Sequence, residues 1–283
     1  MKNKSLSLKS TTDNLSRKTL SGQEKNRLWW ESLPMTYEDW DSKTRIPETR
    51  EDFLDIERKF LIESPYIRNK FNFAKLKGKS ILEIGCGTGV VSCLFAKNDA
   101  EVTAIDITRQ GIDITNKNAK AQKVRINAIQ QDAENLEFLD EAFDYVFSWG
   151  VLHHSKDTLK AFKQVARVLK KDGEGLIMVY NKNSARYYIN GLYWLLLRGK
   201  ILKGYNFETV QDFYTDGYYH RHFTPKELRI ELEKNELKCT KVFKTHMGGY
   251  RMLPFVPLKL ENWIKNNFGW LLVAEFKINK KDY

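Results

Sequence analysis

The sequence predicts an α/β fold in which a mostly parallel sheet carries helices on both faces. Between residues 80 and 180, short β-branched runs alternate with segments of helical periodicity, as in parallel sheets. Gly85, Gly87 and Gly89 follow the first of these strands and precede a helical segment at 90–96. Two further alternating runs, at 239–245 and 270–278, are expected to close the sheet as an antiparallel hairpin.

The N-terminal part is expected to be an addition to this core. The first 27 residues hold seven basic and two acidic side chains without hydrophobic periodicity, so residues 1–22 are predicted to form a disordered basic tail. Nucleic-acid or anionic-membrane contact is the less favoured alternative for this tail. Residues 23–70 are predicted to be a helical and aromatic segment, with a helix at 51–62. Its Trp29, Trp30, Tyr37 and Trp40 are too apolar to remain in water, and they either pack on the domain surface or form part of a lid.

The expected core strands lie near 80–84, 102–106, 126–130, 144–148 and 175–180. A helix is expected near 157–170, with Gly173 as its C-cap. Its apolar face is formed by Leu159, Phe162, Val165, Ala166 and Leu169. After the fifth strand, residues 182–222 form an aromatic-rich insertion, and the capping box Thr224-Pro225-Lys226-Glu227 opens a new helix.

The insertion contains the most apolar segment outside the sheet, residues 186–203. This segment is too short and too interrupted to span a bilayer, which takes about 20 residues. We expect either a lid that buries its apolar face on its own domain or a helix that lies in a membrane interface. Both alternatives rest on the aromatic side chains of this segment and on the cations that flank them. The aromatic residues are Tyr187, Tyr188, Tyr193 and Trp194, and the cations are Arg186, Arg198, Lys200 and Lys203.

The glycine turn predicts a cradle for a small cofactor, because glycine lets the backbone approach a ligand closely and the following helix offers unpaired N–H groups. A dinucleotide site would place the third glycine one residue later than Gly89. The P-loop-like triplet Gly78-Lys79-Ser80 precedes the strand instead of following it, so that match is chance. The third option is S-adenosylmethionine, whose ammonium group could meet Glu83.

Two further carboxylates sharpen this choice. Asp106 ends the second strand, where a carboxylate can accept hydrogen bonds from ribose hydroxyls of NAD or of an adenosyl ligand. Asp132-Ala133 follows the third strand and is placed to meet an adenine ring. With Glu83-x-Gly85-x-Gly87-x-Gly89 and the later motifs 143–146 and 151–154, the chain resembles the class I S-adenosylmethionine-dependent methyltransferases. It is similar in particular to the group that includes ubiquinone- and menaquinone-type small-molecule enzymes.

The resemblance is strong over roughly residues 70–180 and looser elsewhere. It implies a Rossmann-like seven-stranded sheet in a domain at 71–283, with a lid insertion at about 182–238, and S-adenosylmethionine as cofactor. The cofactor residues that it implies are Glu83, Gly85, Cys86, Gly87, Gly89, Asp106, Ile107, Asp132, Ala133, Ser148 and Trp149.

Four histidines are candidates for a general base: His153, His154, His220 and His222. Histidine suits proton transfer near neutral pH, and the first two follow the fourth strand at the binding edge. The alternative is that they are structural or that they surround the cofactor without transferring a proton. No metal site is expected, because the three cysteines and five histidines lack ligand spacing.

These patterns predict methyl transfer to an O, N or C centre of a small, partly apolar or aromatic acceptor. The alternatives are an NAD(P)-dependent oxidoreductase, a catalytically idle adenosyl-binding partner subunit and a nucleic-acid methyltransferase. Against the last, Ser148-Trp149-Gly150 stands where an Asn/Asp-Pro-Pro-aromatic motif would be. The cysteine usage and polar N-terminus predict a cytoplasmic protein, with peripheral membrane contact as an additional hypothesis. The oligomeric state cannot be read from the sequence.

Overall fold

The computed structural model describes residues 20, 22–32, 46–245 and 255–279. Most of the predicted basic tail, and the predicted lid residues Tyr37 and Trp40, lie outside these residues. The described helices are α2 (Gly22–Glu31), α3 (Arg50–Glu63), α4 (Pro65–Asn69), α5 (Val90–Lys97), α6 (Arg109–Gln122), α7 (Thr158–Val168), α8 (Ala185–Leu192), α9 (Pro225–Lys234) and α10 (Leu258–Phe268). Short helical turns are η1 (Phe73–Leu76), η2 (Leu152–His154), η3 (Tyr193–Leu197), η4 (Lys200–Lys203) and η5 (Thr209–Phe213).

The strands form one sheet with the order β3-β2-β1-β4-β5-β8-β7, and β6 pairs with β5 outside this path. They are β1 (Ser80–Ile84), β2 (Glu101–Asp106), β3 (Asn127–Gln130), β4 (Phe143–Trp149), β5 (Leu169–Asn181), β6 (His222–Phe223), β7 (Leu237–Thr245) and β8 (Leu271–Ile278). The first five strands run parallel, whereas β8 pairs antiparallel with both β5 and β7. The predicted seven-stranded α/β sheet is confirmed. The two-residue β6 is an addition that is too short to leave a periodic signal.

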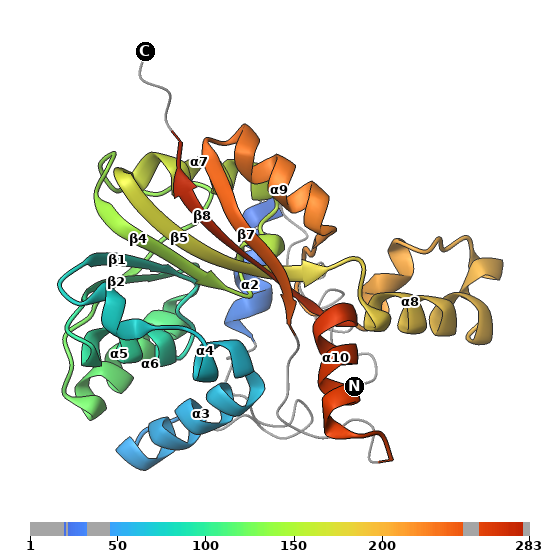
Figure 1. Cartoon of the computed structure of the whole chain (residues 1–283), viewed down its shortest axis with the longest axis horizontal. Helices are drawn as coiled ribbons and strands as arrows, with labels where there is room; N and C mark the ends of the chain where they lie inside the picture. The colour runs from blue at the N-terminus through green and yellow to red at the C-terminus, as the bar shows by residue number, and fades with distance from the viewer. Residues whose placement is uncertain (1–19, 21, 33–45, 246–254, 280–283) are drawn as a thin grey trace.

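Helices cover both faces of the sheet because its strands are apolar on both sides (Figure 1). Leu82 and Ile84 of β1 pack in the same core as residues of α7 and α9. The neighbouring Ile81 points to the other face, where it packs in a core with residues of α3, α4 and α5. Both cores leave the carboxyl ends of β1, β2, β4 and β5 along one edge of the parallel sheet.

Helix α7 differs from its prediction at the C-terminal end. It ends at Val168, and its C-cap residue Leu169 is extended, with φ −74° and ψ 136°. The chain therefore enters β5 without a left-handed residue. The predicted C-cap Gly173 lies inside this strand, and Leu159 is 37% exposed. Because β5 is long and contains a register shift opposite Phe143 and Tyr145, its start could not be recognised from a single short apolar run.

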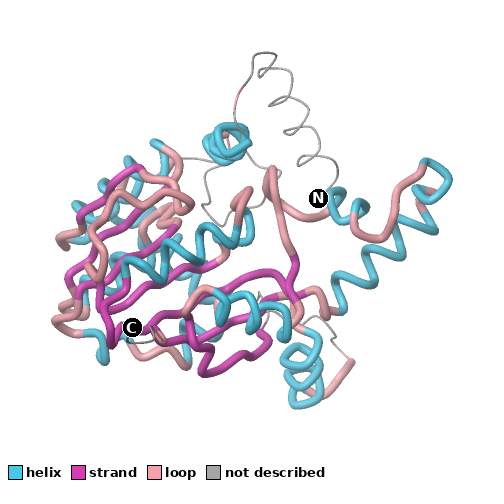
Figure 2. Tube along the Cα trace, turned by 90° about the horizontal axis from the view of Figure 1, so that it is seen from above, coloured by secondary structure: helices cyan, strands magenta, loops and turns pink. Residues whose placement is uncertain are grey.

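The insertion after β5 contains an arm, which we define as residues 185–203 (α8, η3 and η4). Both views show the arm projecting from the sheet domain (Figures 1 and 2). Ser184 caps the N-terminus of α8, because its hydroxyl accepts a hydrogen bond from the N–H of Tyr187 at 3.1 Å. Helix α8 continues into the π-helical turn η3. No helix in the described part of the chain has the length and apolar character needed to cross a bilayer.

Candidate functional site

A cavity opens at the carboxyl edge of the parallel strands. Its wall is formed by the glycine turn after β1, the ends of β2, β4 and β5, the loop after β3, helix α2 and one residue of the insertion, Asp216. Of the predicted cofactor residues, those that line it are Gly85, Cys86, Gly87, Asp106, Ile107, Asp132, Ala133 and Trp149. The cavity is therefore built where ligands bind in open α/β sheets.

The glycine turn forms one wall of the cavity with its backbone. The N–H groups of Gly85 and Cys86 donate to the Ile105 carbonyl oxygen at 2.7 and 3.0 Å. Gly85 has φ +80°, and a Cβ there would lie 2.1 Å from Val151. Gly87 also has a positive φ of +54°, but a Cβ at this position would meet nothing within 4 Å. The turn thus requires glycine for its conformation, and the missing side chain of Gly87 leaves space for a ligand beside the backbone.

Asp106 joins the turn to the end of β2. One carboxylate oxygen accepts the N–H of Gly87 at 2.9 Å, and the other accepts the N–H and hydroxyl of Thr108 at 2.9 and 2.7 Å. Burial raises the pKa of Asp106, while the hydrogen bonds from Thr108 and Gly87 oppose this rise. A fixed carboxylate on a cavity wall suits the hydroxyl pair of a ribose.

Three predicted cofactor residues lie behind the cavity wall. Glu83 is only 4% exposed and accepts a hydrogen bond from the Ser92 hydroxyl. Burial raises the pKa of its carboxyl group to about 8. The Ser148 hydroxyl donates to the Ile84 carbonyl oxygen at 3.1 Å, and Gly89 caps α5, where a Cβ would lie 2.9 Å from Thr115. The structure brings these residues to the back of the turn and not to the cavity surface.

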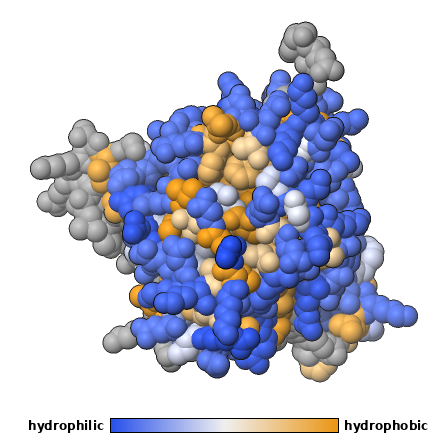
Figure 3. All heavy atoms as spheres, turned by 90° about the vertical axis from the view of Figure 1, so that its left-hand side faces the viewer, coloured by the Kyte–Doolittle hydropathy of each residue, from blue (hydrophilic) through white to orange (hydrophobic). Residues whose placement is uncertain are grey.

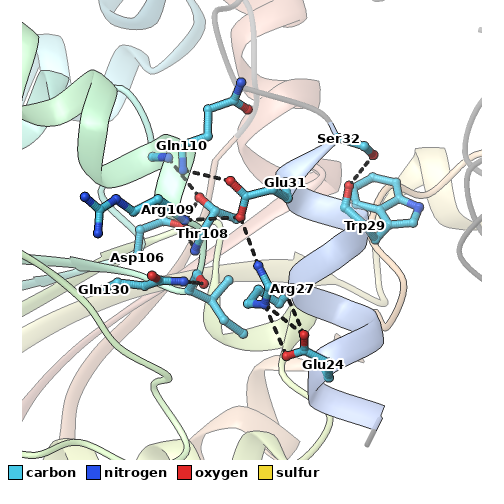
Figure 4. Close-up of polar contacts among 12 residues, drawn as sticks. Glu24, Arg27, Trp29, Glu31, Ser32, Asp106, Thr108, Arg109, Gln110 and Gln130 are labelled. Carbon is cyan, nitrogen blue, oxygen red and sulfur yellow. Dashed lines mark hydrogen bonds and ion pairs between the residues drawn. The ribbon is translucent and has the colours of Figure 1, made fainter. Parts of the chain in front are cut away.

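Helix α2 lies against the cofactor side of the cavity, where sequence reasoning gave no specific contact. The side-chain amide of Gln23 donates to the Asp132 carboxylate at 2.7 Å. Glu31 accepts the N–H groups of Arg109 and Gln110 at 3.1 and 2.8 Å, at the start of α6 (Figure 4). The negative charge of Glu31 is favourable at the N-terminus of α6. The contacts of Gln23 and Glu31 together hold α2 on the domain. Gln23, Asn26 and Trp30 of α2 line the cavity.

The four predicted histidines divide into different environments. Of these four, His154 lines the cavity, and its Nδ1 donates to the Tyr219 carbonyl oxygen at 2.8 Å. This bond makes Nε2 the acceptor nitrogen of the neutral ring. His153 is fully buried, neither ring nitrogen has a partner within the described residues, and burial lowers its pKa well below the usual value.

His220 and His222 lie outside the cavity wall. Nε2 of His220 is 2.6 Å from the Asp212 carboxylate. Burial lowers the pKa of His222 well below the usual value. Of the four, only His154 lines the cavity at the glycine turn, whereas His220 lines a second, smaller pocket beside the start of α7; a role as base remains a prediction for each.

The cavity continues past His154 toward β5 and β8. Trp30, Trp149, Met178 and Leu271 form apolar and aromatic walls there, and Tyr180 and Asp216 add polar groups. Neither Tyr180 nor Asp216 was singled out in the sequence. Tyr180 could have been found, because it lies at the carboxyl end of a predicted strand. Asp216 lies in the insertion, whose sequence has no regular period. Among the described residues, no three His, Cys, Asp or Glu side chains are grouped as a metal site would require.

Comparison with known proteins identifies the domain. The family described as "Methyltransferase domain" matches residues 81–173, which run from β1 into β5 and hold the cradle. A ubiquinone biosynthesis O-methyltransferase of Actinobacillus pleuropneumoniae is 28% identical over 75% of this chain and 84% of its own length. The chain contains a class I methyltransferase domain. The cofactor of this methyltransferase domain is S-adenosylmethionine, and the backbone turn and rim carboxylates described above fit that group.

Other relatives match the methyltransferase domain over different lengths. A ubiquinone biosynthesis O-methyltransferase of Coxiella burnetii is 34% identical over 40% of this chain. The aligned part spans 48% of that relative, about half of its length. Among solved structures, a Pyrococcus horikoshii protein has a TM-score of 0.54 at 17% identity, covering 88% of this chain and 98% of its own. A Haloferax volcanii complex of the Trm112 methyltransferase activator with a putative methyltransferase has a TM-score of 0.56 at 13% identity. The match covers 83% of this chain and 95% of the matched chain. These two show the fold.

Proposed function

We propose that the protein transfers the methyl group of S-adenosylmethionine to an O, N or C centre of a small acceptor that is partly apolar or aromatic. The observation that carries this proposal is the continuity of the cavity: the glycine cradle opens directly into a chamber walled by Trp30, Trp149 and Tyr180. The aligned relatives named as ubiquinone biosynthesis O-methyltransferases support a ring-containing acceptor.

The residues of the cavity have separate roles in this proposal. Asp106 binds the ribose hydroxyls, and Asp132 together with Gln23 lies at the adenine. The cofactor supplies an already activated methyl group, so the protein mainly aligns donor and acceptor and removes a proton where the acceptor carries one. His154 is the predicted histidine at the cavity wall, where it can contact the acceptor.

A turnover assay with simple ring acceptors tests the proposal. The full chain is incubated with S-adenosylmethionine and catechol, and the formation of S-adenosylhomocysteine and methylated product is measured. We expect acceptor-dependent product that disappears when catechol is replaced by a small hydrophilic compound such as glycine. Turnover of glycine but not of aromatic acceptors would contradict the proposed acceptor class. Cofactor binding without turnover of any acceptor would favour the idle adenosyl-binding subunit.

We further propose that the arm contacts an anionic membrane. Its large apolar side chains are exposed, Leu197 to 80% and Leu202 to 89%. The others are Tyr188, Ile189, Leu192, Tyr193, Leu196 and Ile201. Monomeric soluble proteins rarely expose such groups together. By contrast, the opposite side of the molecule is largely hydrophilic, with apolar side chains mainly in a central strip (Figure 3).

The charge of the arm supports an anionic membrane as its partner. Arg198, Lys200 and Lys203 lie between its apolar residues. Arg198 lies over the ring of Trp194 and Lys200 over the ring of Phe213, and the ion pairs found among the described residues include none of the three cations. Apolar side chains flanked by cations suit the headgroup region of anionic lipids. This placement would bring the domain close to apolar acceptors dissolved in the bilayer.

Vesicle flotation tests this contact. We expect the full chain to float with vesicles that contain phosphatidylglycerol and to stay behind with pure phosphatidylcholine. The double variant Leu197→Asp/Leu202→Asp should lose flotation, because it places charge in the apolar region of the interface. The matched control is Leu139→Asp, at an equally exposed leucine outside the arm, which should float like the wild type. No flotation with anionic vesicles, or self-association through the arm instead, would contradict the proposal.

A further inference from the structure

The chamber beyond the cradle contains a carboxylate that the proposed function has not used. We propose that Asp216 binds the acceptor through an O–H or N–H group and accepts the proton that this group loses during methyl transfer. This inference rests on the proposed function and specifies the class of its acceptor: an aromatic alcohol or an aromatic amine that carries a proton on the reacting atom.

The position of Asp216 relative to the sheet separates it from the cofactor. The cradle is built on β1 and β2, whereas Tyr180, which lines the same chamber as Asp216, is the penultimate residue of β5. The order β2-β1-β4-β5 places β5 two strands away from β1, or about 10 Å at the usual strand spacing. A ligand group that reaches Asp216 is therefore part of the acceptor, because the cradle and the β2 end hold the donor on the other side of β4.

The backbone around Asp216 is held in place. The N–H of Thr215 donates to the Gln211 carbonyl oxygen at 3.0 Å, and Arg186 donates to the Tyr214 carbonyl oxygen at 3.3 Å. Gly217 has φ +98°, and a Cβ there would lie 2.3 Å from Nδ1 of His154. The close approach of Gly217 to His154 thus fixes the segment against the cavity wall and presents the Asp216 side chain to the chamber.

The hydrogen bonds and ion pairs found among the described residues involve neither the carboxylate of Asp216 nor the hydroxyl of Tyr180, and both residues are half-buried and line the cavity. Asp216 acts electrostatically on Tyr180, so the two side chains lie near each other and offer a carboxylate and a hydroxyl for hydrogen bonds with a ligand in the cavity. Burial raises the pKa of Asp216. The nearby Arg186 and His220 favour the charged form of this carboxyl group and oppose the rise, but burial has the larger effect. A carboxylate shifted toward neutral pH is suited to accept a proton.

The proposed step balances as a single displacement. A lone pair of the acceptor oxygen or nitrogen forms a bond to the methyl carbon, the carbon–sulfur bond breaks, and its electron pair remains on sulfur to give S-adenosylhomocysteine. The proton of the acceptor O–H or N–H passes to Asp216. Tyr180 can hydrogen-bond to the same acceptor group, and the rings of Trp30 and Trp149 provide the apolar surface for the rest of the acceptor.

Matched pairs of probes test this binding. With the full chain saturated in S-adenosylhomocysteine, binding of catechol is compared with 1,2-dimethoxybenzene, which has the same ring without O–H groups. Aniline is compared with toluene, which lacks the amine. We expect at least one protic probe to bind about tenfold more tightly than its partner, in line with a hydrogen bond to a charged group. Asp216→Asn should remove this preference and Tyr180→Phe should reduce it. The two pairs distinguish an alcohol from an amine.

A second measurement separates ligand binding from a structural role. Because burial disfavours its charge, Asp216→Asn should raise the melting temperature of the ligand-free protein. The control Asp212→Asn removes a carboxylate that is paired with His220 on the same segment. This control should lower the melting temperature of the ligand-free protein. The proposal is overturned if no protic probe is preferred, if the preference survives in Asp216→Asn, or if both variants lower the melting temperature alike. If wild type does not bind S-adenosylhomocysteine, the proposed function itself fails; if it does but no preference is found, only this inference fails.

Discussion

Glu83→Gln is expected to stabilise the ligand-free protein by about 3 kcal/mol at pH 7, because the buried carboxyl group has a pKa raised from 4.5 to about 8. Below the pKa that the Glu83 carboxyl group has in the unfolded chain, this group is protonated in both the folded and the unfolded state. Its burial then does not lower the free energy of unfolding. As pH rises from about 4.5 to 8, the unfolded chain loses this proton while the folded protein keeps it. The wild type therefore loses stability over this window, and the loss is complete above it.

Denaturant unfolding of wild type and Glu83→Gln across this pH window measures the effect. The difference in free energy of unfolding should grow with pH and then level off near pH 8. Glutamine can keep the hydrogen bond with Ser92, so the comparison isolates the charge. The control Glu101→Gln changes an exposed side chain of β2 and should not alter stability. A difference that does not depend on pH would show that the Glu83 carboxyl group is not the source.

Asp106→Ala should weaken S-adenosylhomocysteine binding by about 1–3 kcal/mol, or roughly 5- to 150-fold, the usual loss when a charged hydrogen-bond partner is removed. The variant also frees the N–H of Gly87, which the carboxylate holds in the wild type. Asp106→Asn keeps the shape but replaces one acceptor oxygen by a donor, and should bind with intermediate affinity. The control is Asp113→Ala on α6, whose side chain is 54% exposed.

Calorimetric titration gives these affinities, with circular dichroism to verify folding. Unchanged affinity in a folded Asp106→Ala variant would mean that the ribose does not lie at the end of β2. A loss of the same size in Asp113→Ala would instead indicate a general disturbance of α6.

The sheet could be predicted because its strands leave a local signal. β1 and β2 are short apolar runs bounded by turns, and the glycine turn identifies the ligand edge. By contrast, β6 has two residues and no period. The start of β5 was not predicted because polar residues, Lys170, Lys171 and Asp172, follow the buried Leu169 and separate it from the apolar run. Such features depend on partners in the sheet that are distant in sequence.

The candidate site was predictable on its cofactor side and not on its acceptor side. Gly85, Gly87 and Asp106 belong to a motif, but Gln23 reaches Asp132 across 109 residues of sequence. The two adjacent histidines both lie in the turn η2 and are both buried, yet only His154 lines the cavity, which their sequence could not decide. Asp216 reaches the chamber through tertiary packing of Gly217 on His154, which no sequence pattern records.

Methyl transfer in this cavity requires that it binds S-adenosylmethionine. The most direct test is a calorimetric titration of the full wild-type chain with S-adenosylhomocysteine and, separately, with NAD. We expect a dissociation constant in the micromolar range for S-adenosylhomocysteine and no measurable heat with NAD. Preferential binding of NAD, or no binding of S-adenosylhomocysteine by the folded protein, would contradict this expectation.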